Sequence, residues 1–154
     1  MTVRTGWSAM DAVALLARFA LAAVWIASGV LKMQNPGATL LSVRAYELFP
    51  DAAERFIALA LPALEVALGV LLVLGIFLRA TSLLSALIFL AFIAGIASAW
   101  ARGLTIDCGC FGGGGYNSSV NPWDYVKEIL RDTAFIALAA IVAWKPLNKL
   151  AVWP

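Results

Sequence analysis

Histidine is absent from this chain, and charged residues make up only 13% of its 154 residues. The lack of histidine removes the commonest general base at neutral pH and the commonest metal ligand. Ser-His-Asp or Cys-His catalysis within this chain is therefore excluded. The net charge of +2 is small and unclustered, so we expect no nucleic-acid partner.

Cysteine is also scarce, and both cysteines lie in one short stretch. Cys108 and Cys110 stand one residue apart, in a run that continues through several glycines to residue 115. Two cysteines without histidine cannot complete a four-ligand zinc site within one chain, and Asp107 would add only one oxygen ligand. The sequence therefore predicts no resident metal.

Apolar residues, by contrast, are abundant. They account for 63% of the sequence, and the mean hydropathy is +0.92, whereas soluble domains carry roughly 45–50% apolar residues. This composition indicates an integral membrane protein, whose helices must cross a hydrocarbon core of about 30 Å. We predict a single membrane domain over residues 1–154, with spans at about 11–31, 56–78, 81–101 and 122–144.

The last of these segments is the least regular. Asn121 and Pro122 are typical of a helix start, and Asp124 suits a first helical turn. The uninterrupted apolar run from Thr133 to Trp144 would extend only about 18 Å at about 1.5 Å per residue. We therefore expect the polar first half of this helix to stand outside the membrane or to be shielded by the other helices.

The connections between these segments differ greatly in length. Only Arg79-Ala80 separates the second and third spans, which predicts a tight antiparallel hairpin. The longer segment 32–55 contains turn chemistry at Asn35-Pro36-Gly37, followed by apolar residues that predict a short interfacial helix before Pro50. The other long connection, 102–120, carries the cysteines. The prediction is an all-α, four-helix membrane bundle with both termini on one side and the two long loops on the other.

Orientation in the membrane depends on where lysine and arginine lie. Their density favours cytoplasmic termini, although their total number does not. An exchangeable or disulfide-bonded cysteine pair is expected on an oxidising, extracytoplasmic face. We therefore predict a multi-pass protein of a bacterial inner membrane, with cytoplasmic termini and an extracytoplasmic cysteine loop.

A disulfide between Cys108 and Cys110 would close a very small ring. Gly109 helps the backbone to bend, but strain in such a ring makes a disulfide easier to reduce. Closing so short a loop also removes little entropy from the unfolded chain. An exchangeable pair is thus favoured over a static staple and over two thiols without a role. The neighbouring Asp107 disfavours a thiolate, whereas Arg102 favours one if it lies close.

Two charged residues lie well inside the predicted spans. Arg18 belongs to the first span and Glu65 to the second, at similar depths on antiparallel helices. Intramembrane charges usually pair or face a cavity, so we predict that these two form a buried pair or line a shared cavity. Such a pair could serve a structural or a functional role. Pro62 would loosen the second helix, and the following small residues are expected to be close-packing contacts between helices: Gly29, Gly69, Gly75, Gly95 and Ser98.

Several of these stretches resemble DoxX-like membrane proteins. The segments 18–21 and 28–32 resemble the first helix of that family, and 61–65 with Gly69 resembles the second. The Asp107-Cys108-Gly109-Cys110-Phe111-Gly112 string resembles the branch related to methylamine-utilisation proteins of the MauE type. Arg102-Gly103 and Arg131-Asp132 fit the same branch, and the resemblance covers roughly residues 12–144.

The resemblance implies a redox-associated membrane protein that supports disulfide formation or thiol transfer in extracytoplasmic partners, often ones with thioredoxin-like domains. It identifies Cys108 and Cys110 with the motif cysteines of the family. It assigns no role to the polar positions, which are Arg18, Glu65, Arg131 and Asp132.

Our hypothesis from the sequence is thiol–disulfide exchange, in which one cysteine attacks a partner disulfide and the other resolves the mixed disulfide. Electrons would need a second carrier, either a membrane quinone or another thiol protein, and the sequence fixes no cofactor. The main alternative is a non-catalytic subunit or assembly factor of a larger membrane complex. A third is a carrier of a soft metal or metalloid. Whether the chain is an enzyme of the thiol–disulfide oxidoreductase type stays open.

Overall fold

The computed structural model describes residues 6–107, 114–147 and 151–152, and these form five helices and one two-stranded hairpin. Cys108 and Cys110 lie outside the described residues. The helices are α1 (Ala9–Gln34), α2 (Pro36–Ala45), α3 (Asp51–Leu74), α4 (Leu78–Ala101) and α5 (Pro122–Trp144). The strands are β1 (Ile106–Asp107) and β2 (Gly115–Tyr116).

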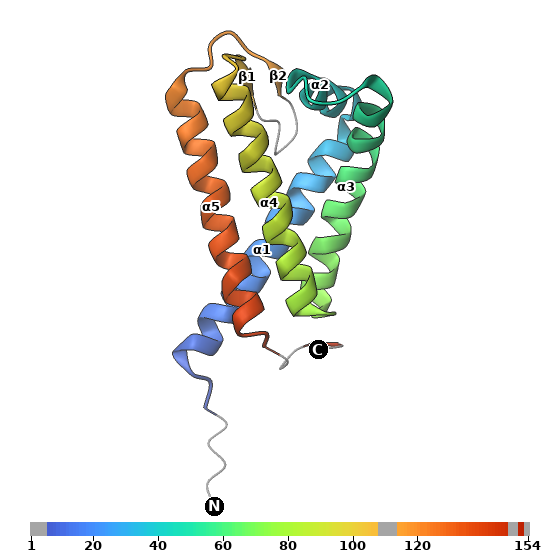
Figure 1. Cartoon of the computed structure of the whole chain (residues 1–154). Coiled ribbons are helices and arrows are strands. Elements are labelled where there is room, and N and C mark those ends of the chain that lie inside the picture. Colours follow the sequence, from blue (N-terminus) through green and yellow to red (C-terminus); the bar gives the residue numbers. More distant parts are fainter. Residues whose placement is uncertain (1–5, 108–113, 148–150, 153–154) are drawn as a thin grey trace, which may run out of the picture.

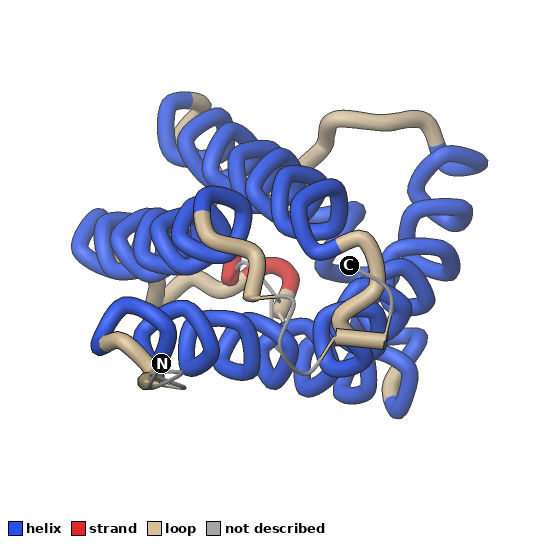
Figure 2. The backbone as a smooth tube through the Cα atoms, turned by 90° about the horizontal axis from the view of Figure 1, so that it is seen from below, coloured by secondary structure: helices blue, strands red, loops and turns tan. Residues whose placement is uncertain are grey.

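The long helices run along the length of the molecule (Figure 1). The beginning of α1 and the end of α5 lie at one end, and α2 lies with the β1–β2 hairpin at the opposite end. Helix α1 contacts α3 and α5, α4 contacts α5, and α2 contacts both strands. Seen from below, the strands show between the surrounding helices (Figure 2). The two long connections thus meet at one end of the molecule, as the sequence predicts.

Three of the helices are long and apolar enough to cross a membrane, namely α1, α3 and α4. Many of their large apolar side chains face outward: Leu16, Phe56, Leu59 and Leu87 are each more than 60% exposed. An outward-facing apolar surface of this kind is expected where the solvent is lipid, because hydrocarbon does not penalise exposed leucine.

Side-chain caps fix the beginnings of two of the long helices. Ser8 and Asp11 form a capping box at α1, in which each side chain accepts a hydrogen bond from the other residue's backbone N–H. Asn121 and Asp124 form a capping box at α5, with Pro122 as its first residue. The predicted helix start at Asn121 is confirmed.

The predicted short helix before Pro50 is also confirmed. Helix α2 begins directly at Pro36 and is capped by the Asn35 side chain, which accepts from the Ala38 N–H at 3.1 Å. The residues that α2 buries are Thr39, Ser42 and Ala45, while Leu41 is 57% exposed. The small polar face of α2 therefore packs on the protein, and Leu41 faces outward.

The turn between α3 and α4 lies earlier than the predicted Arg79-Ala80 connection, and that prediction is wrong. Gly75 adopts a left-handed conformation (φ +73°), and the N–H groups of Gly75 and Ile76 both bond to the Leu71 carbonyl. Glycine tolerates this geometry at a helix end without the steric cost of a Cβ. Arg79 consequently belongs to the first turn of α4 and donates to the Ala143 carbonyl of α5 at 3.2 Å.

Helices α1 and α3 approach each other closely at two glycines. A Cβ added at Gly29 would lie 2.6 Å from Val66 Cγ2 and 2.7 Å from the Pro62 carbonyl oxygen. A Cβ at Gly69 would lie 2.4 Å from Ile26 Cγ1. The predicted close-packing role of both glycines is confirmed. Pro62 is accommodated within α3, which continues on both sides of it.

The buried side chains form one cluster in the middle of the molecule and another at the hairpin end. In the first, Trp25 stacks on Phe89 with ring centroids 4.4 Å apart, and its indole N–H donates to Ser85 Oγ at 2.9 Å. In the second, Ile106 of β1 and Tyr125 of α5 pack together with residues of α2 and α4. This second cluster joins the hairpin to the helices.

Candidate functional site

A buried ion pair connects the last turn of α1 to the middle of α3. Lys32 Nζ lies 2.6 Å from Glu65 Oε1 and 2.9 Å from Ser28 Oγ. Lys32 is 4% exposed and Glu65 is completely buried. Ser28 and Lys32 are four residues apart and therefore share one face of α1. In an apolar environment each charge depends on the other, because an unpaired charge there would be costly.

Arg18 does not pair with Glu65, so the predicted direct pair is wrong. Its Nε donates to the Leu72 carbonyl at 2.6 Å and its Nη2 donates to the Val73 carbonyl at 2.7 Å. These carbonyls lie near the end of α3, about 10 Å along the helix from Glu65 at about 1.5 Å per residue. The last carbonyls of a helix lack intrahelical donors, which explains why they attract the guanidinium. Both residues are nevertheless buried, as expected.

Lys32 is the residue that sequence reasoning missed. The sequence pattern places Lys32 at the start of the connecting segment 32–55, whereas α1 continues to Gln34. The signal that could have revealed it is the Ser28–Lys32 spacing, which places a hydroxyl and an amine on the same face as Gly29 and Trp25. That face packs against α3, where Glu65 is the buried acid.

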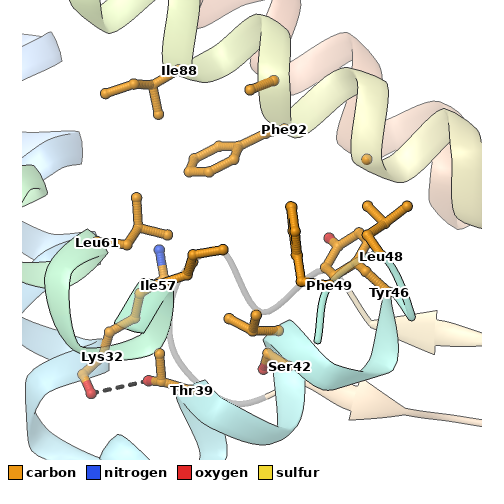
Figure 3. Close-up of a pocket in the computed structure, with 13 residues that line it drawn as sticks. Lys32, Thr39, Ser42, Tyr46, Leu48, Phe49, Ile57, Leu61, Ile88 and Phe92 are labelled. Atoms are coloured by element: carbon orange, nitrogen blue, oxygen red, sulfur yellow. Dashed lines mark hydrogen bonds between the residues drawn. The ribbon is translucent and has the colours of Figure 1, made fainter. Parts of the chain in front are cut away.

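A pocket of about 320 Å³ lies beside this ion pair, between α2, α3 and α4 (Figure 3). Its walls are formed largely by apolar and aromatic side chains, among them Tyr46, Phe49, Leu61 and Phe92. Figure 3 shows Phe92 and Phe49 projecting into the space and the amine of Lys32 reaching toward it from α1. A pocket of this volume, apolar with a single charged group, is typical of a site for a small organic molecule.

The Lys32 ammonium retains a donor toward this pocket. An ammonium carries three N–H donors, and the acceptors bonded to Lys32 Nζ within the described chain are Ser28 Oγ and Glu65 Oε1. The Phe92 ring centroid lies 5.6 Å from Nζ on the pocket side. Glu65 Oε2 is likewise buried, with no hydrogen-bond donor among the described residues. Lys32 is thus the member of the ion pair that lines the pocket, and it has a further N–H to donate there.

Strands β1 and β2 flank the cysteine segment in the sequence. Ile106 pairs with Tyr116 and Asp107 with Gly115, so the residues on either side of 108–113 are held together. The Tyr125 hydroxyl donates to the Leu104 carbonyl and accepts from the Ile106 N–H at 3.2 Å. Gly115 lies against Leu41 of α2, since a Cβ there would be 3.7 Å from the Leu41 carbonyl oxygen. Helix α2 thus contacts both the hairpin and the pocket.

The other polar residues singled out from the sequence lie in separate places. Arg102 follows α4 and donates to the carbonyls of Tyr46 and Glu47, which ties that helix end to the end of α2. Asp107 is exposed and borders a polar hollow of about 420 Å³. Arg131 Nη2 lies 3.0 Å from Asp132 Oδ1 on α5, and Asp132 is 1% exposed.

Taken together, the apolar spans and the buried ion pair define an integral membrane protein with a polar centre between α1 and α3. The chain belongs to the methylamine utilisation protein MauE family, whose family model matches residues 10–145. This finding confirms the resemblance seen in the sequence.

A curated relative from Paracoccus denitrificans, named methylamine utilization protein MauE, is 33% identical over 127 residues. The aligned region covers 82% of this chain and 66% of the relative, just under two thirds of the relative's length. No solved structure matches the chain.

Proposed function

We propose that this protein supports redox maturation at the membrane by exchanging disulfides with an extracytoplasmic partner through Cys108 and Cys110. In the exchange, a partner thiolate attacks the Cys108–Cys110 disulfide and forms a mixed disulfide. The second partner thiolate then attacks the mixed disulfide, which leaves an oxidised partner and a reduced cysteine pair. The partner loses two electrons and two protons, and the cysteine pair gains both.

The observation that carries this proposal is the attachment of the cysteine segment to the hairpin. The strands that precede and follow 108–113 in the sequence are paired with each other, and Tyr125 and Leu41 contact those strands from α5 and α2. Functional loops are commonly presented in this way by a rigid scaffold. A disulfide in so small a ring would also be easily reduced, which suits exchange better than structural stabilisation.

The proposed topology places α5 as a fourth membrane helix beside the three apolar ones. Its first half carries charged residues, but Asp132 is buried and paired with Arg131, so this half is partly shielded by the protein. The termini would then be cytoplasmic, and the hairpin and α2 would lie on the extracytoplasmic side. This arrangement would present the cysteines to a thioredoxin-like or disulfide-containing partner.

The name of the relative indicates that it participates in methylamine utilisation. Membership in the same family supports an accessory role for this chain toward an enzyme system of that kind. A purely non-catalytic subunit would keep this accessory role without any need for the two thiols.

The test compares Cys108→Ser, Cys110→Ser and the double variant in the native host, with thiols alkylated at lysis and proteins separated on non-reducing gels. Either single variant lacks the disulfide and can react only in the reverse direction, in which its remaining thiolate attacks the disulfide of an oxidised partner. The variant that keeps the cysteine attacked by the partner in the forward reaction should accumulate this mixed disulfide, because the second cysteine that would resolve it is absent. The double variant is the control and should form no adduct. If neither single variant yields a reducible adduct and both retain full function, the exchange proposal is wrong and a non-catalytic subunit is favoured.

A further inference from the structure

The pocket between α2, α3 and α4 is not used by the exchange step, and its chemistry is unlike that of a simple packing defect. We infer that it binds the head group of a membrane quinone, with Lys32 donating a hydrogen bond to a quinone carbonyl. Three features of the described chain support this assignment, namely the size of the pocket, the charged donor Lys32 in its lining and its opening to the surface.

The size and walls of the pocket suit a substituted aromatic ring. Its volume of about 320 Å³ is roughly twice that of an engineered cavity of about 150 Å³ that accommodates benzene. Phe49 and Phe92 project into it from the α2–α3 connection and from α4 (Figure 3). Aromatic side chains interact favourably with another ring in offset or edge-on arrangements.

The Lys32 donor distinguishes a quinone from a lipid tail. Lys32 is almost fully buried, and its ammonium has an N–H beyond those directed to Ser28 and Glu65. A buried donor without an acceptor is destabilising. An acyl chain would leave this donor unsatisfied, whereas a quinone carbonyl would accept its hydrogen bond. Glu65 holds the amine in position and balances its charge.

The pocket also reaches the surface, where a lipid-soluble ligand could enter. Leu48 and Phe49 line the pocket and are 45% and 48% exposed. They lie between α2 and α3, directly before α3, which is long and apolar enough to cross a membrane. A quinone dissolved in the bilayer would therefore meet this opening without crossing water.

The redox consequence rests on the proposed function, although quinone binding itself does not. The reduced Cys108–Cys110 pair would give two electrons and two protons to the quinone, which becomes a quinol, and the disulfide would be restored. Atoms and charge balance in this step, because the two thiol protons are those that the quinol carries. The reaction returns the protein to the form that oxidises its partner.

The experiment uses the full chain in nanodiscs with Cys108→Ser and Cys110→Ser, so that binding is measured without thiol chemistry. Titration with decylubiquinone should show saturable binding by calorimetry. Combining Lys32→Met with Glu65→Leu removes the donor without leaving a buried charge, and this variant should bind at least tenfold more weakly. Gly95→Leu, which fills the pocket and leaves Lys32 intact, should also weaken binding. Lys127→Met, on the exposed start of α5, is the matched control and should bind normally.

Saturable binding that depends on Lys32 and on the volume at Gly95 supports the inference. Binding that is absent, or that is equal in the Lys32→Met/Glu65→Leu variant and the parent, overturns it and assigns the pocket to ordinary lipid. A partner adduct without quinone binding would refute this inference and leave disulfide exchange standing. Quinone binding without any adduct would refute disulfide exchange and leave the quinone site standing.

Discussion

Lys32 and Glu65 form an ion pair of 2.6 Å beside one of the two close contacts between α1 and α3. Gly29, one turn before Lys32, lies against Pro62 and Val66, which flank Glu65 on α3. The close approach of the two backbones brings a lysine and a glutamate side chain together away from water. The pair therefore fixes the register of two helices and also provides the polar group of the pocket.

Replacing Glu65 with glutamine should destabilise the protein strongly, because the Lys32 charge would stay buried without its counter-ion. Removal of one partner of a buried ion pair typically costs about 3–5 kcal/mol. Glu47→Gln is the matched control, since Glu47 is exposed and bonds to Tyr116 at the surface. Unfolding of each variant in detergent, followed by circular dichroism, measures the difference.

A second comparison separates the charge from the volume of the Glu65 side chain. The double variant Lys32→Met/Glu65→Leu should be more stable than either single variant, because no uncompensated charge is left. Equal stability of Glu65→Gln and Glu47→Gln, or a double variant that is less stable than both singles, would contradict the assigned ion pair.

Burial of Arg18 and Glu65 could be predicted from the sequence, but their partners could not. Apolar runs around each residue indicate a buried position in a span. The choice of partner depends on where each helix ends, and the predicted ends of both α1 and α3 differ from those in the structure. Gly75 stops α3 before Arg79, which leaves the carbonyls that bind Arg18, and α1 extends far enough to include Lys32.

The helix caps were predictable for a different reason. A cap such as Asn121 or a turn such as Asn35-Pro36 depends on neighbouring residues, so local sequence is sufficient. The pocket depends instead on α2, α3 and α4 together, and its lining residues come from distant parts of the chain. The small polar face that α2 buries gave no hydrophobic pattern from which its packing could be inferred.

Introducing a methyl group at the helix contact should separate α1 from α3. Gly29→Ala places a Cβ 2.7 Å from the Pro62 carbonyl oxygen, a backbone atom that cannot move freely. We expect a loss of about 1–3 kcal/mol, as for other overpacked sites. Gly95→Ala is the control, because its Cβ would lie 3.5 Å from the Tyr46 ring, at ordinary contact distance.

Both substitutions replace a helical glycine with alanine, so the gain in helix propensity is similar in each. Thermal unfolding in the same detergent should therefore show Gly29→Ala as clearly less stable than Gly95→Ala. A Gly29→Ala variant as stable as the parent would mean that the helices do not approach as described.

The contact between the hairpin and the α2–α3 connection should depend on pH. The Tyr116 hydroxyl donates to Glu47 Oε1 at 2.7 Å, and this hydrogen bond raises the pKa of Tyr116 above its usual value of 10.0. Only the protonated phenol can donate. The contact therefore stabilises the fold below the unfolded pKa of about 10 and is lost as pH rises through the higher folded pKa.

In Glu47→Gln the Tyr116 pKa should fall back toward 10, because the negative acceptor is gone. Nuclear magnetic resonance of tyrosines labelled at Cζ would follow each phenol separately, with Tyr116→Phe identifying the signal. A Tyr116 pKa that is unchanged between the parent and Glu47→Gln would rule out this hydrogen bond as the cause.

The Tyr125 hydroxyl holds the backbone that leads into β1 and the cysteine segment. Tyr125 bonds to backbone groups on either side of Thr105, directly before β1 and the cysteines. Tyr125→Phe keeps the ring in its cluster but removes the hydroxyl. The Ile106 N–H and the Leu104 carbonyl would both lose a partner, while the helix itself is unaffected. Loss of two hydrogen bonds worth about 1 kcal/mol each corresponds to about a thirtyfold shift in a local opening equilibrium.

We therefore expect the thiols of reduced Tyr125→Phe to react about thirtyfold faster with a maleimide than those of the parent, in line with the opening equilibrium. Trp123→Phe is the control, because Trp123 lies on the same helix and is 62% exposed. If disulfide exchange needs a positioned cysteine pair, Tyr125→Phe should also trap less partner when combined with a single cysteine substitution. Faster alkylation with undiminished trapping would show that the hairpin shields the cysteines without positioning them, and unchanged alkylation would show that Tyr125 does not hold this segment.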